Sequence, residues 1–199
     1  MSDVMPRNRP LPVGSAGKHA SGWWGLLALI VTEGSLFGYL LFSYFYLASQ
    51  TTRHWPPEGL PPLIMPGLNT AILLASSGFV WASEHFIRRR QRPWSLAAMA
   101  VAVLLGVGFV MIQFGEWNKK AFDLTATLYD SLYFTITGFH LLHVAVGLVI
   151  LLLLLLWTAL GYFDDRRHAA MTIGGLYWHF VDVVWLFVFT TLYLTPYLF

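Results

Sequence analysis

The sequence predicts an all-α, polytopic membrane protein, a bundle of five transmembrane helices. Hydrophobic residues make up 57% of its 199 residues, charged residues only 11%, and the mean hydropathy is +0.61. Soluble domains carry about 25% charged residues, so this chain has too little polar surface to face water on all sides. Five apolar stretches also reach the length of about 20 residues that a helix needs to cross a bilayer core of about 30 Å.

These five stretches define the expected helices, in a single bundle over residues 23–199. They are Trp23–Leu47, Pro66–Phe86, Trp94–Gly115, Leu132–Leu160 and Gly175–Leu194. The segment 1–22 is polar, contains three prolines and lacks the apolar core of a signal peptide, so we expect a disordered tail. The first and second stretches are separated by the proline-rich run Trp55–Pro62, which is unsuited to helix and predicts an extended surface segment.

Glycine and tryptophan add expectations about packing. Gly34 and Gly38 form a small-x-x-x-small face on the first helix, and Gly106 and Gly108 narrow the third, so helices should approach closely there. Tryptophan side chains prefer the membrane interface. Those at positions 23, 24, 55, 94, 117 and 178 mostly fall near predicted helix ends and are expected to anchor the bundle there.

The cationic residues predict an orientation. With the N-terminus inside, nine Lys and Arg side chains lie in inner segments and three in outer ones. The inner set is Arg7, Arg9, Lys18, Arg88, Arg89, Arg90, Arg92, Arg166 and Arg167, and the outer set is Arg53, Lys119 and Lys120. Because cytoplasmic loops carry the excess of positive charge, we expect the N-terminus inside and the C-terminus outside. Confinement of the charges to loops also leaves no basic face for nucleic acid.

The chain contains no cysteine, which restricts its chemistry. Without thiolates it cannot form disulfides, bind an iron–sulfur cluster, hold a thiolate zinc site or attack through sulfur. Any chemistry inside the membrane would depend on histidine and carboxylate side chains.

Seven polar residues inside the predicted helices are candidates for a site. They are Glu33 in the first helix, Gln113 and Glu116 in the third, His140 and His143 in the fourth, and His179 and Asp182 in the fifth. Each pair is spaced by three residues, which places both members on one helix face. Burying such groups in hydrocarbon costs several kcal/mol unless they are paired, so intramembrane ionisable residues are functional candidates by default.

Similar spacing builds di-iron sites in helical bundles, but the expected depths argue against a metal or haem site. From the helix rise, His143 should lie about 5 Å outward of mid-membrane, and Glu33 and Asp182 about as far inward. We therefore expect interhelical hydrogen bonds, with Glu33 bonded to Asp182 or to an imidazole, and no metal or cofactor in this chain. A proton-relay role, above all for Glu33, remains the alternative.

Several motifs along the chain resemble those of one family, subunit III of the haem-copper terminal oxidases, the cytochrome c oxidase family. The motifs are Thr32-Glu33; His54-Trp55-Pro56-Pro57 with Gly59; Leu68-Asn69-Thr70 and Leu73-Leu74-Ala75-Ser76; Gln113 with Glu116-Trp117 and Ala121-Phe122; Gly138 to Val144; and Tyr177 to Trp185. Leu141 departs from the family's glycine between the two histidines. The seven-helix form's first two helices are missing, so the chain looks like the five-helix bacterial version.

The resemblance implies a non-catalytic subunit of a proton-pumping oxidase in a bacterial inner membrane. Haems and copper would lie in partner subunits I and II, with cytochrome c as electron donor to the complex and membrane phospholipids around it. The chain would stabilise subunit I and aid proton uptake, and Glu33 would correspond to the family's carbodiimide-reactive glutamate. Three alternatives stay open: an accessory protein of a nitric oxide reductase, a quinol oxidase subunit III, and a free-standing transporter.

Overall fold

The computed structural model describes residues 21–51, 55–57, 59–119, 127–163 and 168–198, and this part of the chain is all-helical. The helices are α1 Ser21–Gln50, α2 Ile64–Arg88, α3 Arg92–Lys119, α4 Leu128–Ala159 and α5 Ala169–Phe189, which continues into a π-helical turn, Thr190–Leu194, and a 3₁₀ turn, Thr195–Tyr197. Five helices are long and apolar enough to cross a membrane, so the predicted fold class is confirmed. The expected tail lies outside the described residues apart from its last two, which begin α1.

All five helices begin before their apolar stretches, and the difference is largest for α4 and α5, at four and six residues. α4 starts at Leu128 because Thr127 caps it: the Thr127 side chain accepts a hydrogen bond from the Asp130 backbone nitrogen at 3.1 Å. The Asp130 carboxylate also accepts a hydrogen bond from the Thr127 hydroxyl group at 2.6 Å. An acidic side chain in the first turn of a helix is favourable. α5 starts at Ala169, and its first turns are attached to α2 where the Thr172 hydroxyl donates to Glu84. A cap and a cross-helix hydrogen bond therefore hold the first turns of α4 and α5, which lie outside the apolar stretches.

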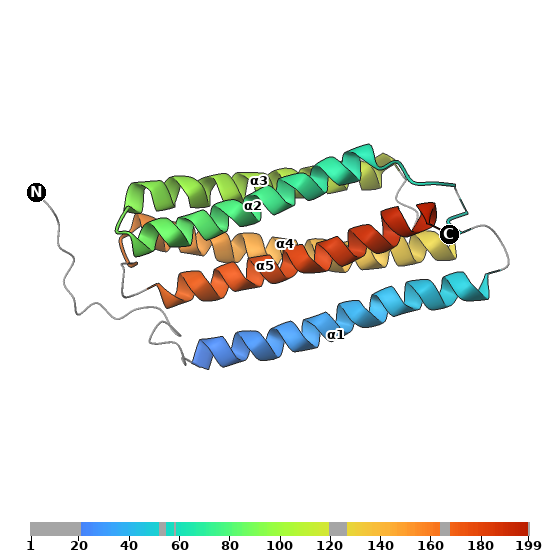
Figure 1. Cartoon of the computed structure of the whole chain (residues 1–199), viewed down its shortest axis with the longest axis horizontal. Coiled ribbons are helices and arrows are strands. Elements are labelled where there is room, and N and C mark those ends of the chain that lie inside the picture. Colours follow the sequence, from blue (N-terminus) through green and yellow to red (C-terminus); the bar gives the residue numbers. More distant parts are fainter. Residues whose placement is uncertain (1–20, 52–54, 58, 120–126, 164–167, 199) are drawn as a thin grey trace, which may run out of the picture.

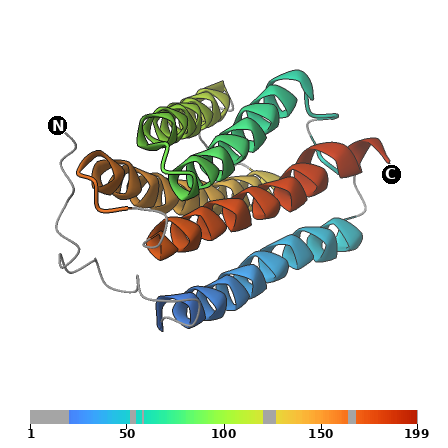
Figure 2. The same cartoon turned by 60° about the vertical axis from the view of Figure 1, so that its left-hand side comes forward.

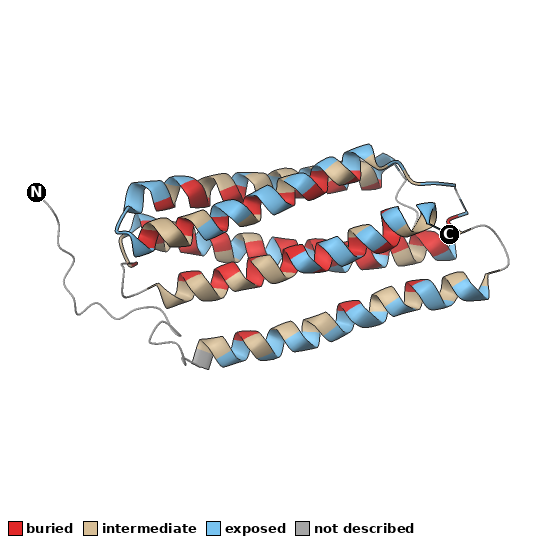
Figure 3. Ribbon diagram, in the orientation of Figure 1, coloured by how far each residue is buried: buried red, intermediate tan, exposed pale blue. Residues whose placement is uncertain are grey.

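The helices form a four-helix group with a fifth helix at its side. Figures 1 and 2 show α1 running along α5 at a distance from the α2–α3 pair. Contacts are densest between α2 and α3, while α1 contacts α5 and, less extensively, α4. Buried residues accordingly concentrate on α2 to α5, and α1 is mostly exposed or half-buried (Figure 3).

An arginine of α3 joins this helix to α4 at the end of the bundle where α2 turns into α3, which we call the arginine end. The Arg92 guanidinium donates from Nε to the Thr158 carbonyl oxygen at 2.9 Å and from a terminal nitrogen to the carbonyl of Ala159. These carbonyls end α4, where the helix leaves acceptors without intrahelical partners and where a cation is favourable. The α2–α3 hairpin is therefore attached to α4 through the helix terminus.

The centre of the bundle is built around Trp178 of α5, which is fully buried. Its indole N–H donates to the Ser76 hydroxyl on α2 at 3.0 Å. Its ring lies against two glycines: a Cβ at Gly147 of α4 would be 2.7 Å from the ring, and one at Gly106 of α3 would be 2.9 Å from it. One side chain thus contacts three neighbouring helices, in a slot that only residues without a side chain leave open.

Two packing predictions are corrected here. Trp178 is the central core residue and not an interface anchor, because α5 begins at Ala169 and this position lies well inside the helix. The close approach expected at Gly34, Gly38 and Gly108 is also wrong: a Cβ at Gly34 would be 3.9 Å from Phe180, and one at Gly38 or Gly108 would meet nothing within 4 Å. Small residues permit close packing but do not require it, and α1 uses larger side chains for contact.

The glycine slot yields a stability prediction. Gly147→Ala places a methyl group into the Trp178 ring, a rigid neighbour, and should lower the free energy of unfolding by about 1–3 kcal/mol. Gly108→Ala is the matched control, since a Cβ there would meet nothing within 4 Å. The measurement is denaturant unfolding in detergent, followed by helical circular dichroism. Equal stability of the two variants would mean that the slot does not hold the bundle together.

Candidate functional site

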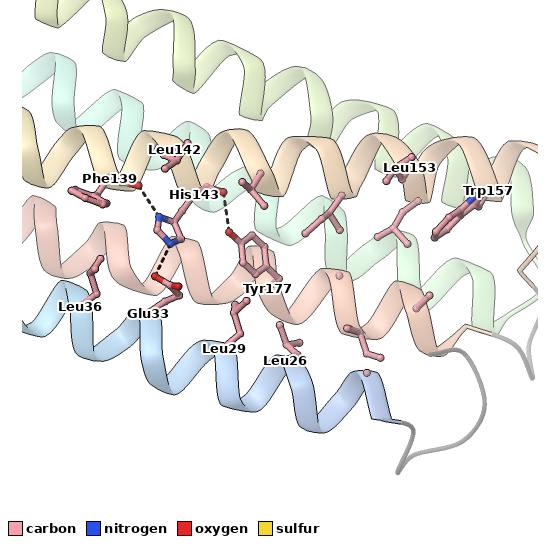
Figure 4. A pocket seen from close by; sticks show the side chains of 17 residues that line it. Leu26, Leu29, Glu33, Leu36, Phe139, Leu142, His143, Leu153, Trp157 and Tyr177 are labelled. Atoms are coloured by element: carbon pink, nitrogen blue, oxygen red, sulfur yellow. Dashed lines mark hydrogen bonds and ion pairs between the residues drawn. The ribbon is translucent and has the colours of Figure 1, made fainter. Parts of the chain in front are cut away.

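The clearest polar interaction inside the membrane region joins α1 to α4. Glu33 of α1 lies with one carboxyl oxygen 3.1 Å from Nε2 of His143 on α4, and His143 Nδ1 lies 2.7 Å from the Phe139 carbonyl oxygen (Figure 4). Both side chains are partly buried, with exposed fractions of 32% for Glu33 and 13% for His143. The expectation that Glu33 bonds to an imidazole is therefore met by His143.

The geometry of His143 fixes the proton count of this pair. A carbonyl oxygen can only accept, so the Phe139 contact requires the hydrogen on Nδ1. Nε2 then either accepts from a protonated Glu33 or, in an imidazolium, donates to the Glu33 carboxylate. In both arrangements the two side chains share one further proton and carry no net charge. A neutral pair of this kind is compatible with a low-dielectric setting that would exclude either charge alone.

The predicted difference in depth between these residues is wrong. The sequence placed Glu33 and His143 on opposite sides of mid-membrane, whereas their side chains are in hydrogen-bonding distance. Because Thr127 caps α4 at Leu128 and not at Leu132, the middle of the helix shifts to His143. The estimate from the apolar stretch omitted the first turn of α4, so it placed the centre of the helix too close to its leucine-rich end.

The Glu33–His143 pair lines a cavity of about 750 Å³ between α1, α4 and α5. The cavity extends along the bundle to the arginine end, where Gly22, Trp157 and Ala170 line it. Its walls are mainly leucine, isoleucine and valine, and Tyr177 adds the third polar side chain, with its hydroxyl 3.3 Å from the His143 carbonyl oxygen (Figure 4). Tyr177 was not among the predicted site residues, because a tyrosine among aromatic residues gives no signal of its own.

His140, which the spacing placed on one face with His143, is in a different environment. Phe37 contacts both rings, with centroid distances of 6.3 Å to His140 and 5.1 Å to His143. His140 is buried between Phe109 and Trp185, whose ring centroids lie 5.9 and 4.8 Å away. Neither ring nitrogen has a hydrogen-bond partner among the described residues, so the expected interhelical hydrogen bond is not formed here.

His179 and Asp182 lie where α5 meets α2. His179 Nδ1 makes a short hydrogen bond with the Ser77 hydroxyl group, as expected for an interhelical pair. Ser77 also lies beside the Asp182 carboxyl group, but its hydrogen bond goes to His179. Asp182 is only 3% exposed, and neither of its oxygens has a hydrogen-bond partner within the described part of the chain. The expectation of a satisfied hydrogen bond therefore holds for His179 and is wrong for Asp182.

Gln113 and Glu116 lie near the opposite end of α3 from Arg92. Gln113 is buried beside the Tyr133 hydroxyl group, and Glu116 forms an ion pair with Lys119 at 2.7 Å. The Tyr133 and Tyr193 hydroxyls meet at 2.9 Å and connect α4 to the π-helical turn. Gln113 therefore lies beside this tyrosine pair, whereas the ion pair of Glu116 stays within α3.

The described residues contain no group of three His, Asp or Glu side chains that could hold a metal ion. Four of the seven candidate residues instead form two separate sets, while His140 and the pair Gln113 and Glu116 lie apart from both. One set, Glu33 and His143, lies on the α1 side of the bundle, and the other, His179 and Asp182 with Ser77, lies between α2 and α5. Ser77 was missed because a serine inside an apolar helix is common and usually bonds its own backbone.

Comparison with known proteins agrees with these motifs. Residues 17–197 match the family model described as cytochrome c oxidase subunit III. The chain is 34% identical over 177 residues to cytochrome c oxidase subunit 3 of Pongo pygmaeus, and 35% identical over the same length to that of Petromyzon marinus. Each alignment covers 85% of this chain and 68% of the relative. This chain belongs to the cytochrome c oxidase subunit III family.

Proposed function

We propose that this chain is the non-catalytic subunit III of a proton-pumping haem-copper oxidase, which transfers electrons from cytochrome c to oxygen. The family match over residues 17–197 carries this proposal. The residue content supports it, since the chain has no cysteine for a thiolate-bridged copper centre, and its described histidines do not converge. Haems and copper then belong to subunits I and II.

The proposed setting is a bacterial inner membrane, with the arginine end on the cytoplasmic side. The cluster Arg88, Arg89, Arg90 and Arg92 at this end supports that orientation through the positive-inside bias. Exposed leucine, valine and phenylalanine side chains occur on all five helices, which suits contact with subunit I on one side and membrane phospholipids on the others. Cytochrome c would meet the complex through its catalytic subunits.

The proposed role of the chain is to stabilise subunit I and assist proton uptake. A rigid bundle with one dense core can hold a neighbouring subunit's helices in place without chemistry of its own. The Glu33–His143 pair adds a group that shares one proton next to a cavity reaching the arginine end. This arrangement supports a part for the pair in proton movement.

The stabilising role predicts a shorter working life for an oxidase without this chain. We expect the complex that lacks it to start at normal activity, then to lose copper and activity several-fold faster during continuous turnover. The measurement follows oxygen consumption and copper content in parallel. Adding the purified chain back before turnover should restore the lifetime, and equal lifetimes with and without it would contradict the role.

A role of Glu33 in proton movement predicts different effects for two substitutions of this residue. Glu33→Gln can still donate an amide hydrogen to His143 Nε2, so the bundle should keep its stability while proton uptake during turnover slows. Glu33→Leu removes the hydrogen bond as well and should also lower stability by about 1 kcal/mol. Ser35→Ala is the control, since its hydroxyl bonds only the Val31 carbonyl of its own helix. If the kinetics of proton uptake are unchanged in Glu33→Gln, with the complex assembled to the same extent, Glu33 contributes to packing only.

A further inference from the structure

Asp182 is a buried acid that the proposed function does not use. It lies on α5, is only 3% exposed, and both carboxyl oxygens lack a hydrogen-bond partner among the described residues. An ionised carboxylate without partners is strongly disfavoured in a membrane interior, whereas a carboxylic acid that keeps its proton is tolerated. The site therefore suits a group that holds a proton.

Polar side chains lead from the surface toward this acid along the contact between α2 and α5. At the arginine end, Arg88 pairs with Glu84, and the Thr172 hydroxyl of α5 donates to the same Glu84 oxygen at 2.6 Å. Further along the same contact, Ser77 bonds His179, and Ser77 lies beside Asp182. We call this row of side chains, from Arg88 and Glu84 to His179, Ser77 and Asp182, the polar file. The exposed fraction of its side chains falls from 54% at Arg88 to 18% at Glu84.

The two helices are antiparallel, which places these groups in order of depth. Thr172 faces Glu84 nearest the arginine end, His179 faces Ser77 two turns farther, and Trp185 faces Thr70 beyond them. Two turns of helix rise about 10 Å. Gly175 and Val80 occupy the interval, and Glu84 is still near enough to His179 for their charges to interact. Water between Glu84 and His179 would complete the file.

We infer that Asp182 is a proton-binding site within the membrane, reached from the arginine end of the bundle through Glu84, His179 and Ser77. Because neither Asp182 oxygen is hydrogen-bonded in the structure, exchange begins when the carboxyl group turns to bring its hydrogen to the neighbouring Ser77 oxygen. Asp182 passes its proton to the Ser77 oxygen while Ser77 gives its own hydrogen to His179 Nδ1, and the imidazole releases its Nε2 hydrogen toward Glu84. In the reverse sequence a solvent proton binds His179 Nε2, Nδ1 returns a hydrogen to the Ser77 oxygen, and Ser77 passes one of its two hydrogens to the Asp182 carboxylate. Each atom ends with its original number of bonds, and repeated passages replace the proton on Asp182 by one from solvent.

The other titratable and charged groups near this file are few. On α2, His85 stacks on Trp81 and Arg88 holds Glu84. On α4, His140 lies against Trp185, the residue one turn beyond Asp182 on α5. The Glu33–His143 pair belongs to the α1 side and forms no part of the file. The inference is therefore independent of the proton role proposed for Glu33.

Infrared spectroscopy of the assembled complex in detergent tests this inference directly. A protonated carboxylic acid gives a carbonyl stretch apart from carboxylate bands, and this stretch shifts when the proton is replaced by deuterium. We expect such a band to disappear in Asp182→Asn, to persist in Glu33→Gln and to exchange readily when the complex is transferred into heavy water. Growth with isotope-labelled aspartate assigns the band in the unaltered chain if Asp182→Asn fails to assemble.

The route is tested by the exchange rate of the same band. Ser77→Ala and His179→Phe should each slow deuterium exchange at Asp182 at least about tenfold while leaving the band in place. Ser35→Ala on α1 is the matched control and should exchange like the unaltered chain. Absence of any aspartic acid band, or exchange that neither substitution slows, would overturn the inference. The test measures no oxidase activity. Its result therefore does not decide whether the proposed function is correct.

Discussion

The fold depends on the fit of the Trp178 ring into a slot made by two glycines. The ring touches α3 at Gly106 and α4 at Gly147, while its N–H reaches Ser76 on α2. Lipid is as apolar as the helix surfaces, so helices in a membrane associate through close packing and hydrogen bonds, not through exclusion of water. One residue that supplies both kinds of contact to three neighbours therefore sets the spacing of the whole four-helix group.

This central packing also keeps the two polar sets apart. Glu33 and His143 meet where α1 approaches α4, beside a cavity, whereas His179, Ser77 and Asp182 lie where α5 contacts α2. Tyr177, Trp178 and His179 are consecutive on α5, so the helix turns one residue toward each set and the tryptophan between them into the core. Tyr177 and His179 thus each connect α5 to a different polar set, on two faces of the helix.

Much of this could be predicted from the sequence, because hydropathy over some 20 residues is a strong signal. The five helices followed from it. The cost of burying Glu33 predicted a hydrogen bond to Asp182 or to an imidazole, and the structure shows the imidazole of His143. The depth of His143 could not be predicted, since the capping residue Thr127 lies outside the apolar stretch and moves the centre of α4. The core position of Trp178 and the unpartnered oxygens of Asp182 also required the structure, because both depend on which helices lie beside α5.

We propose that this chain works as an oxidase subunit without a redox centre of its own. Purification of the tagged chain from membranes in mild detergent, with an absorbance spectrum and metal analysis of the product, tests it most directly. We expect stoichiometric haem and copper to purify with two larger polypeptides and this chain, and the chain to be colourless once it is separated from them. A chain that purifies alone without haem, or that keeps haem after separation, would show that it is not such a subunit.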